Sequence, residues 1–188
     1  MENIIFCSSP FQVLVAKEVV QTVSEDFIGI YLKMSNDARQ DFYAERMAEF
    51  CKEVLVLEGK TVFNDIQEAL KDRAISNLYL ASLDNPVALS IFNPSTMNLY
   101  TFDDGSTSIV PLNLYTQNLE RDIPYTNFTL REVMSLSNRH YTVFEDCILF
   151  PKEKQVFLKL HLEPSHFHRA KNGKKISIFL GQFLGSLL

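Results

Sequence analysis

Short apolar runs alternate with segments of helical periodicity along the first part of this chain. The runs have the composition of strands buried on both faces of a sheet, and they span residues 3–6, 27–32, 53–57, 77–81 and 97–102. Between them, apolar residues recur every three or four positions, which predicts helices from Ser9 onward and over residues 37–51, 62–70 and 86–91. Strands and helices that alternate in this way form right-handed βαβ units. We therefore expect a Rossmann-like α/β domain, a parallel sheet with helices on both faces.

The pattern weakens after Gly105. Residues 107–128 have the composition of a loop-rich stretch, and residues 129–137 are typical of a helix with Thr126 or Asn127 near its N-cap. The apolar, β-rich runs 140–150 and 155–160 predict two further strands.

A polar, glycine-containing segment at residues 170–175 has the composition of a linker. The apolar run 176–180 follows it directly and is typical of a fresh buried strand. The sequence therefore predicts one Rossmann-like domain over residues 1–170. Residues 171–188 are expected to be the linker and first strand of a second, truncated domain that binds a nucleotide.

Composition narrows the class of protein. A hydrophobic share of 46% and a charged share of 22% are ordinary for a soluble domain. The net charge of −5 argues against a nucleic-acid partner, because phosphate contacts need a basic surface. Cys7, Cys51 and Cys147 form no CxxC pair, so we expect reduced, mostly buried thiols. No basic leader and no apolar stretch of about 20 residues is present, which predicts a cytoplasmic protein that can still attach to a membrane surface.

The first candidate site is the turn after the first predicted strand, Cys7-Ser8-Ser9-Pro10-Phe11-Gln12. Ligands of open parallel sheets bind at the carboxyl ends of the strands. Here Ser8, Ser9 and Gln12 would receive an anion or sugar hydroxyls at a helix N-terminus. The alternative is structural: Ser9 followed by Pro10 is a common N-cap sequence and needs no ligand.

The second candidate site is Asp103-Asp104-Gly105-Ser106, which ends another buried strand. Adjacent residues of a strand point to opposite faces, so we expect one carboxylate to face the cleft while the other braces the turn. A carboxylate in a cleft suits general-base catalysis, and Gly105 and Ser106 would lie beside the substrate. The alternative is an ordinary Asp-Gly turn with a solvated acid.

Other polar residues carry weaker signals. His161, His166 and His168 lie close together, but Pro164 and the lack of a fourth ligand favour surface histidines over a zinc site. His140 is interpreted as a satisfied polar residue. Asp84 follows a predicted strand, where helix N-capping explains it as well as a catalytic role does.

Several stretches, in order along nearly the whole chain, resemble the lipooligosaccharide sialyltransferases of glycosyltransferase family 52. The most specific is Thr101-Phe102-Asp103-Asp104-Gly105, which is similar to an acidic-acidic-glycine motif of bacterial sialyltransferases. The other stretches are residues 4–7, 78–83, 140–144 and 176–181.

The resemblance implies the N-terminal, acceptor-side half of a GT-B glycosyltransferase. Members of the family transfer sialic acid from CMP-sialic acid to a terminal galactose of a surface glycolipid, with inversion and without an essential metal or other cofactor. Asp103 or Asp104 would deprotonate or orient the attacking hydroxyl. The resemblance also implies a tendency to form homodimers and a place at the inner face of the bacterial inner membrane.

The chain departs from the family in two respects. After Gly181 the family continues with a small residue and a proline, whereas this chain has Gln182-Phe183-Leu184. The family's second motif, a His-Pro pair that serves CMP, does not occur in this sequence. We therefore expect the chain alone to be inactive and to expose an apolar patch that includes Phe179, Leu180, Phe183 and Leu184. Two alternatives stay open: a non-catalytic remnant that binds a carbohydrate or nucleotide, and a GT-B enzyme that uses another sugar donor.

Overall fold

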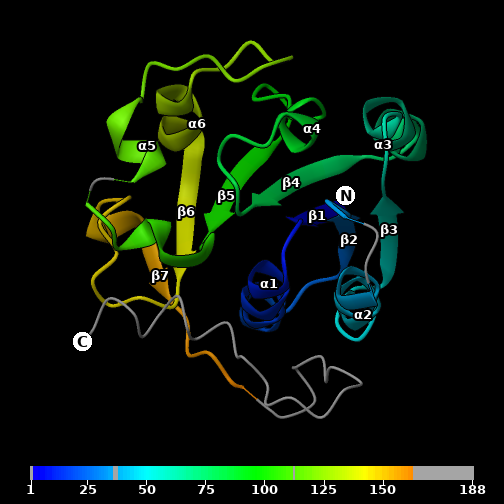
Figure 1. Ribbon diagram of the computed structural model, residues 1–188, viewed down its shortest axis with the longest axis horizontal. Coiled ribbons are helices and arrows are strands. Elements are labelled where there is room, and N and C mark those ends of the chain that lie inside the picture. Colours follow the sequence, from blue (N-terminus) through cyan, green and yellow to red (C-terminus); the bar gives the residue numbers. More distant parts are fainter. Residues whose placement is uncertain (1, 36–37, 112, 163–188) are drawn as a thin grey trace.

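The computed structural model describes residues 2–35, 38–111 and 113–162, and in these ranges seven parallel strands form one sheet (Figure 1). The strand order is β3-β2-β1-β4-β5-β6-β7. The strands are β1 (Glu2–Cys7), β2 (Phe27–Leu32), β3 (Glu53–Leu57), β4 (Ile75–Leu80), β5 (Asn98–Phe102), β6 (Ser137–Thr142) and β7 (Gln155–Phe157). The α-helices are α1 (Pro10–Val23), α2 (Ala38–Met47), α3 (Val62–Leu70), α4 (Pro86–Leu89), α5 (Leu114–Gln117) and α6 (Leu130–Leu136). Short 3-10 helices span Gly105–Ser108 and Lys152–Lys154. The predicted parallel α/β class is confirmed.

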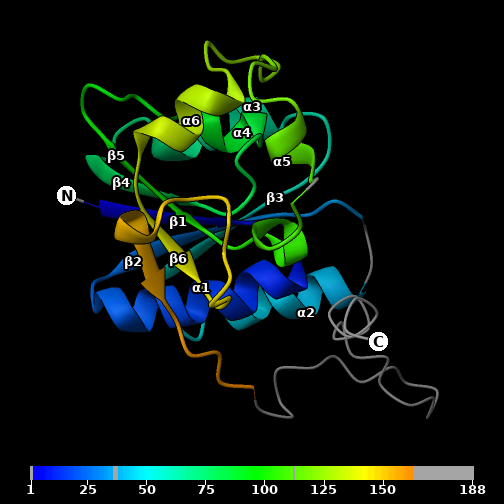
Figure 2. The same cartoon turned by 90° about the vertical axis from the view of Figure 1, so that its left-hand side faces the viewer.

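Helices cover both faces of the sheet. Strands β1 and β2 are buried along nearly their whole length, so their side chains alternate between two hydrophobic cores. Ile4 and Phe6 belong to the core under α3, α4 and α6, whereas Ile5 and Cys7 belong to the core under α1 and α2. Figure 2 shows these two helical layers on opposite sides of the strands. Burial on both faces explains why β1 and β2 read as apolar runs in the sequence.

Two expectations for the second half of the chain need correction. The run 140–150 is only partly a strand: β6 ends at Thr142, because the backbone N–H of Val143 donates to the Asp103 side chain and leaves the ladder. Cys147, Leu149 and Phe150 instead pack into the core from a loop. The N-cap of α6 is Thr129, which forms a capping box with Glu132, and not Thr126 or Asn127.

The strand order reverses between β1 and β4, which pair side by side although two strands separate them in the sequence. After β1 the chain enters α1 on one face, and after β4 it enters α4 on the other. The two loops therefore diverge at the carboxyl edge of the sheet, and this reversal is where open α/β sheets bind ligands. The order 3-2-1-4-5-6 is that of the Rossmann fold.

Cys7, Cys51 and Cys147 are all free and buried, as the sequence predicts. Among the described residues, no helix has the length and apolar character needed to cross a bilayer. The predicted linker, the second-domain strand 176–180 and the apolar patch with Phe179 lie outside the described residues. The proposed boundary at residue 170 lies outside them as well.

Candidate functional site

Three strand ends meet at the strand-order reversal and bring together residues far apart in the sequence. Gln12 follows β1, Ser82 follows β4, and Asp104 follows β5. The Gln12 amide nitrogen donates to Asp104 Oδ1 at 2.7 Å and lies 2.9 Å from Ser82 Oγ. Ser82 Oγ in turn donates to Asp104 Oδ2 at 2.8 Å. The two turns that the sequence singled out separately are therefore parts of one polar cluster.

Asp104 is the half-buried member of the acidic pair. Besides Gln12 and Ser82, the hydroxyl of Tyr115 contacts its Oδ2 at 3.2 Å. The carboxylate is thus held from α1, from the loop after β4 and from α5, while part of the residue remains accessible. Hydrogen bonds from three separate elements fix the orientation of the group, as general-base chemistry requires.

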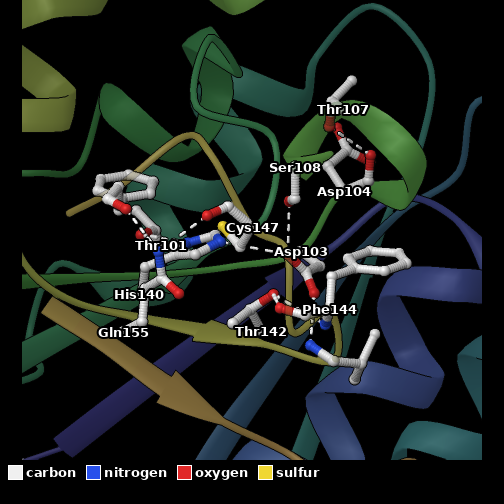
Figure 3. A network of polar contacts seen from close by, with 12 residues as sticks. Thr101, Asp103, Asp104, Thr107, Ser108, His140, Thr142, Phe144, Cys147 and Gln155 are labelled. Atoms are coloured by element: carbon white, nitrogen blue, oxygen red, sulfur yellow. Dashed lines mark hydrogen bonds and ion pairs between the residues drawn. The ribbon is translucent and has the colours of Figure 1, made fainter. Parts of the chain in front are cut away.

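Asp103 points the other way and is fully buried. Its Oδ1 accepts from the Ser108 hydroxyl at 2.5 Å and lies 3.2 Å from His140 Nε2, and its Oδ2 accepts from the Val143 backbone N–H at 2.7 Å. Figure 3 shows Asp103 among Ser108, His140 and Cys147, with Asp104 outside this group beside Thr107. The opposite orientation follows from strand geometry. Asp103 braces the turn and has no exposed surface for a substrate.

His140 balances the buried charge of Asp103. Its Nδ1 contacts the Thr101 hydroxyl at 3.0 Å, and its ring stacks on Phe150 with centroids 4.4 Å apart. Burial alone would lower the pKa of His140, but the hydrogen bonds and charges of Asp103 and Cys147 outweigh it and raise the pKa. The interpretation of His140 as a satisfied polar residue agrees with these contacts, and the sequence did not indicate its partner.

Asp103, His140 and Cys147 could hold a metal ion, because one ligand atom of each lies within 4.8 Å of the others. Structural zinc sites normally take four protein ligands, and catalytic sites keep an open position for water. In the described part of the chain no fourth His, Cys, Asp or Glu joins the group, and all three residues are buried. The contacts fit a structural hydrogen-bond network better than a metal centre. That the enzyme needs no metal stays a prediction.

The serines and Gln12 are engaged within the protein. Ser9 Oγ accepts from the Gln12 backbone N–H, which is the N-cap that the structural alternative described. The Gln12 side-chain oxygen accepts from the Ser8 backbone N–H at 2.6 Å and lies 3.2 Å from the Ser8 hydroxyl. Because Gln12 is only 2% exposed, its visible role is to hold Asp104. Ser8 remains half-buried at this edge of the sheet.

Gly105 and Ser106 begin the 3-10 helix directly after the acidic pair. Gly105 has φ +67°, a left-handed conformation that glycine adopts without strain. This turn lets the chain leave β5 sharply, so that Ser108 returns to Asp103 only five residues later. Both Gly105 and Ser106 are half-buried beside Asp104.

Tyr115, Asp84 and Arg121 also belong to the cluster, and sequence reasoning did not assign them to it. The Tyr115 hydroxyl lies 3.4 Å from Asp84 Oδ1, and Arg121 Nη2 donates to Asp84 Oδ2 at 2.5 Å. Asp84 does not cap α4, because Asn85 accepts from the first helical N–H groups. Asparagine is a strongly preferred N-cap residue, so Asn85 in the sequence could have indicated that Asp84 is not the cap and has another role.

The predicted histidine cluster is only partly described. His161 Nδ1 lies 3.1 Å from Glu18 Oε2, and the His161 backbone N–H donates to the other Glu18 oxygen. The contact ties the end of the described chain to α1. His166 and His168 lie outside the described residues.

Comparison with known proteins places this chain in a family. The model of glycosyltransferase family 52 matches residues 24–186. A CMP-N-acetylneuraminate:beta-galactoside alpha-2,3-sialyltransferase of Pasteurella multocida (strain Pm70) is 26% identical, over 96% of this chain and 63% of the relative. An N-acetyllactosaminide alpha-2,3-sialyltransferase of Haemophilus influenzae (strain ATCC 51907 / DSM 11121 / KW20 / Rd) is 27% identical, over 76% of this chain and 53% of the relative. The chain therefore spans between about half and two thirds of the length of these relatives.

Proposed function

Because the chain belongs to glycosyltransferase family 52, we propose that it forms the acceptor-side part of a sialyltransferase with Asp104 as its general base. The reaction is inverting transfer of sialic acid from CMP-sialic acid to a terminal galactose of a lipooligosaccharide or lipopolysaccharide. One observation carries the choice of base. Asp104 lies half-exposed at the strand-order reversal with its carboxylate held by three donors, whereas Asp103 is fully buried.

The chemistry requires a group of this kind. A sugar hydroxyl is a weak nucleophile, and a base that takes its proton in the transition state accelerates such reactions by about 10² to 10⁴. Asp104 would take the proton from the galactose hydroxyl as the oxygen attacks the sialyl carbon and the CMP leaves. Gln12, Ser82 and Tyr115 hold the carboxylate in place, so that little reorganisation accompanies the transfer.

The donor side of the reaction belongs, in this proposal, to a second Rossmann-like domain of a GT-B enzyme. The relatives contain segments that this chain does not match. The departing phosphate needs an acid or hydrogen-bond donors on the face opposite the base, and we assign that role to the second domain. No metal or other cofactor is required in this scheme. The proposal also includes a homodimer that attaches peripherally to the inner membrane.

The test compares transfer from CMP-sialic acid to a galactose-terminated acceptor by two proteins: this chain, and the chain extended with the C-terminal domain of a family 52 relative. We expect activity only in the extended protein. Asp104→Asn should lower kcat by about 10² or more with little change in stability. Asp72→Asn, a substitution of an exposed acid at the opposite edge of the sheet, is the matched control and should leave the rate unchanged.

The outcomes separate the alternatives. Transfer by the chain alone would overturn the role assigned to the second domain. An extended Asp104→Asn protein that keeps its full rate would remove Asp104 as the base. If the extended protein binds the acceptor but transfers no sugar, the result would favour the alternative of a non-catalytic carbohydrate-binding remnant. Transfer from a different sugar nucleotide would replace sialic acid as the donor group.

A further inference from the structure

A salt bridge between Arg121 and Asp84 lies beside the polar cluster that holds Asp104. Arg121 Nη2 donates to Asp84 Oδ2 at 2.5 Å. The Tyr115 hydroxyl lies 3.4 Å from Asp84 Oδ1 and 3.2 Å from Asp104 Oδ2. A single phenol oxygen therefore connects the salt bridge to the proposed base, although the function proposed above gives the salt bridge no role.

Among the described residues, the Nε of Arg121 is a buried donor without a hydrogen-bond partner. A guanidinium has five N–H donors in a planar fork, and its pairs with carboxylates are often bidentate. Here Asp84 divides its two oxygens between Arg121 and Tyr115. A buried donor without a partner costs stability, and folded proteins keep local costs of this kind mainly at functional sites.

Solvent reaches both side chains of the salt bridge. The exposed fraction is 33% for the Arg121 side chain and 25% for the Asp84 side chain. Asp84 follows β4 at the carboxyl edge of the sheet, and Asp104 follows β5 at the same edge. A ligand that places one group at Asp104 can therefore place another group at the salt bridge.

The charges of this cluster favour a neutral ligand that carries hydroxyl groups. Asp84 and Asp104 bring two negative charges and Arg121 brings one positive charge, so the cluster disfavours a further anion such as a phosphate or a sugar acid. A hydroxyl group, in contrast, can donate to an oxygen of Asp84 and accept from the guanidinium at the same time. Neighbouring carbons of a sugar ring each carry a hydroxyl, so one hydroxyl can lie at Asp104 while the next lies at the salt bridge.

We propose that the salt bridge between Asp84 and Arg121 binds the acceptor sugar through the hydroxyl next to the one that attacks. The proposal rests on the function proposed above, because it takes Asp104 as the base that receives the attacking hydroxyl. Asp84 accepts a hydrogen bond from the neighbouring hydroxyl, and Arg121 donates one to its oxygen. Contacts to two neighbouring hydroxyls fix the orientation of the ring, so the salt bridge determines which hydroxyl faces the base.

The test is an NMR titration of this chain with methyl β-galactoside, which needs neither a sugar donor nor transfer. Arg121→Gln and Asp84→Ala should each raise Kd about tenfold or more, because a hydrogen bond to a charged group is lost. A series of monodeoxy galactosides identifies the hydroxyl that is bound. One analogue should bind about tenfold more weakly than the parent sugar to the unmodified chain. The same analogue should lose no further affinity for Arg121→Gln, because the partner of the missing hydroxyl is already gone.

The matched control is Arg73→Gln. The Arg73 side chain is 26% exposed and pairs with Glu53 at 2.7 Å, at the opposite edge of the sheet. This variant should bind the galactoside as the unmodified chain does. Thermal unfolding should show similar, small losses for Arg73→Gln and Arg121→Gln, because partly exposed ion pairs contribute little to stability. A purely structural salt bridge would instead lower the Tm of Arg121→Gln and leave binding unchanged.

Three results would overturn the proposal. The first is the absence of saturable galactoside binding by the unmodified chain, or equal binding by Arg121→Gln. The second is a loss of affinity at the same deoxy position in the unmodified chain and in Arg121→Gln. The third is Arg121-dependent binding of CMP-sialic acid in place of the galactoside, which would assign the salt bridge to the donor. If galactoside binding depends on Arg121 but the extended protein transfers no sugar, the result counts against the proposed function alone.

Discussion

Replacing Asp103 by alanine should cost the fold about 3–5 kcal/mol, the range seen when one partner of a buried charged pair is removed. Three donors lose their acceptor: the Ser108 hydroxyl, the Val143 backbone N–H and His140 Nε2. Each buried donor left unsatisfied costs about 1–3 kcal/mol. Since small domains are stable by only about 5–15 kcal/mol, the loss is a large share of the total.

Asp104→Ala is the matched comparison, because the same side chain is removed one residue later. Asp104 is half-buried, so water can replace it as an acceptor, and we expect a loss of about 1–2 kcal/mol. Urea unfolding followed by circular dichroism at neutral pH measures both variants, with an unchanged slope taken as the sign that the two-state analysis holds. Equal losses, or a larger loss for Asp104→Ala, would refute the division into a structural and an exposed acid.

Two further predictions concern the core. The pKa of His140 is raised in the folded protein, so its ion pair with Asp103 stabilises the fold fully below the unfolded pKa of about 6.5, and this stabilisation is lost as the pH rises through the folded pKa. The Tm should therefore fall as the pH rises through that range. A His140→Gln variant whose Tm depends on pH in the same way would contradict this. Gly29→Ala should cost about 1–3 kcal/mol, because a Cβ there would lie 2.8 Å from Met47 Cε and 3.0 Å from Cys51 Sγ in a packed core; thermal unfolding checks it, and an unchanged Tm would show that the Met47 and Cys51 side chains can move aside at no cost.

Most helices and strands of the described residues were predictable because their signals are local. The bounds of β2, β3 and α3 equal the predicted ranges. Strand β2 is buried along its whole length and α3 has a regular apolar stripe, and both have a plain sequence pattern. Strand β3 lies at the edge of the sheet and is only partly buried, but its sequence is still mostly apolar. The prediction failed after Thr142, where an apolar run is a loop. There the chain leaves β6 because a side chain from β5 takes its backbone N–H, which is a contact across 40 residues.

The sequence by itself determined the parallel α/β class, the burial of the cysteines and the two turns that carry the acidic pair and Gln12. It also indicated that the two acids point in opposite directions, because adjacent strand residues always do. Which acid is buried, which helix supplies its hydrogen bonds, and that Asp84 and Tyr115 join the site were decided only by tertiary structure. Those relations join strand ends separated by tens of residues, and the strand order that places β1, β4 and β5 side by side is not encoded in any local pattern.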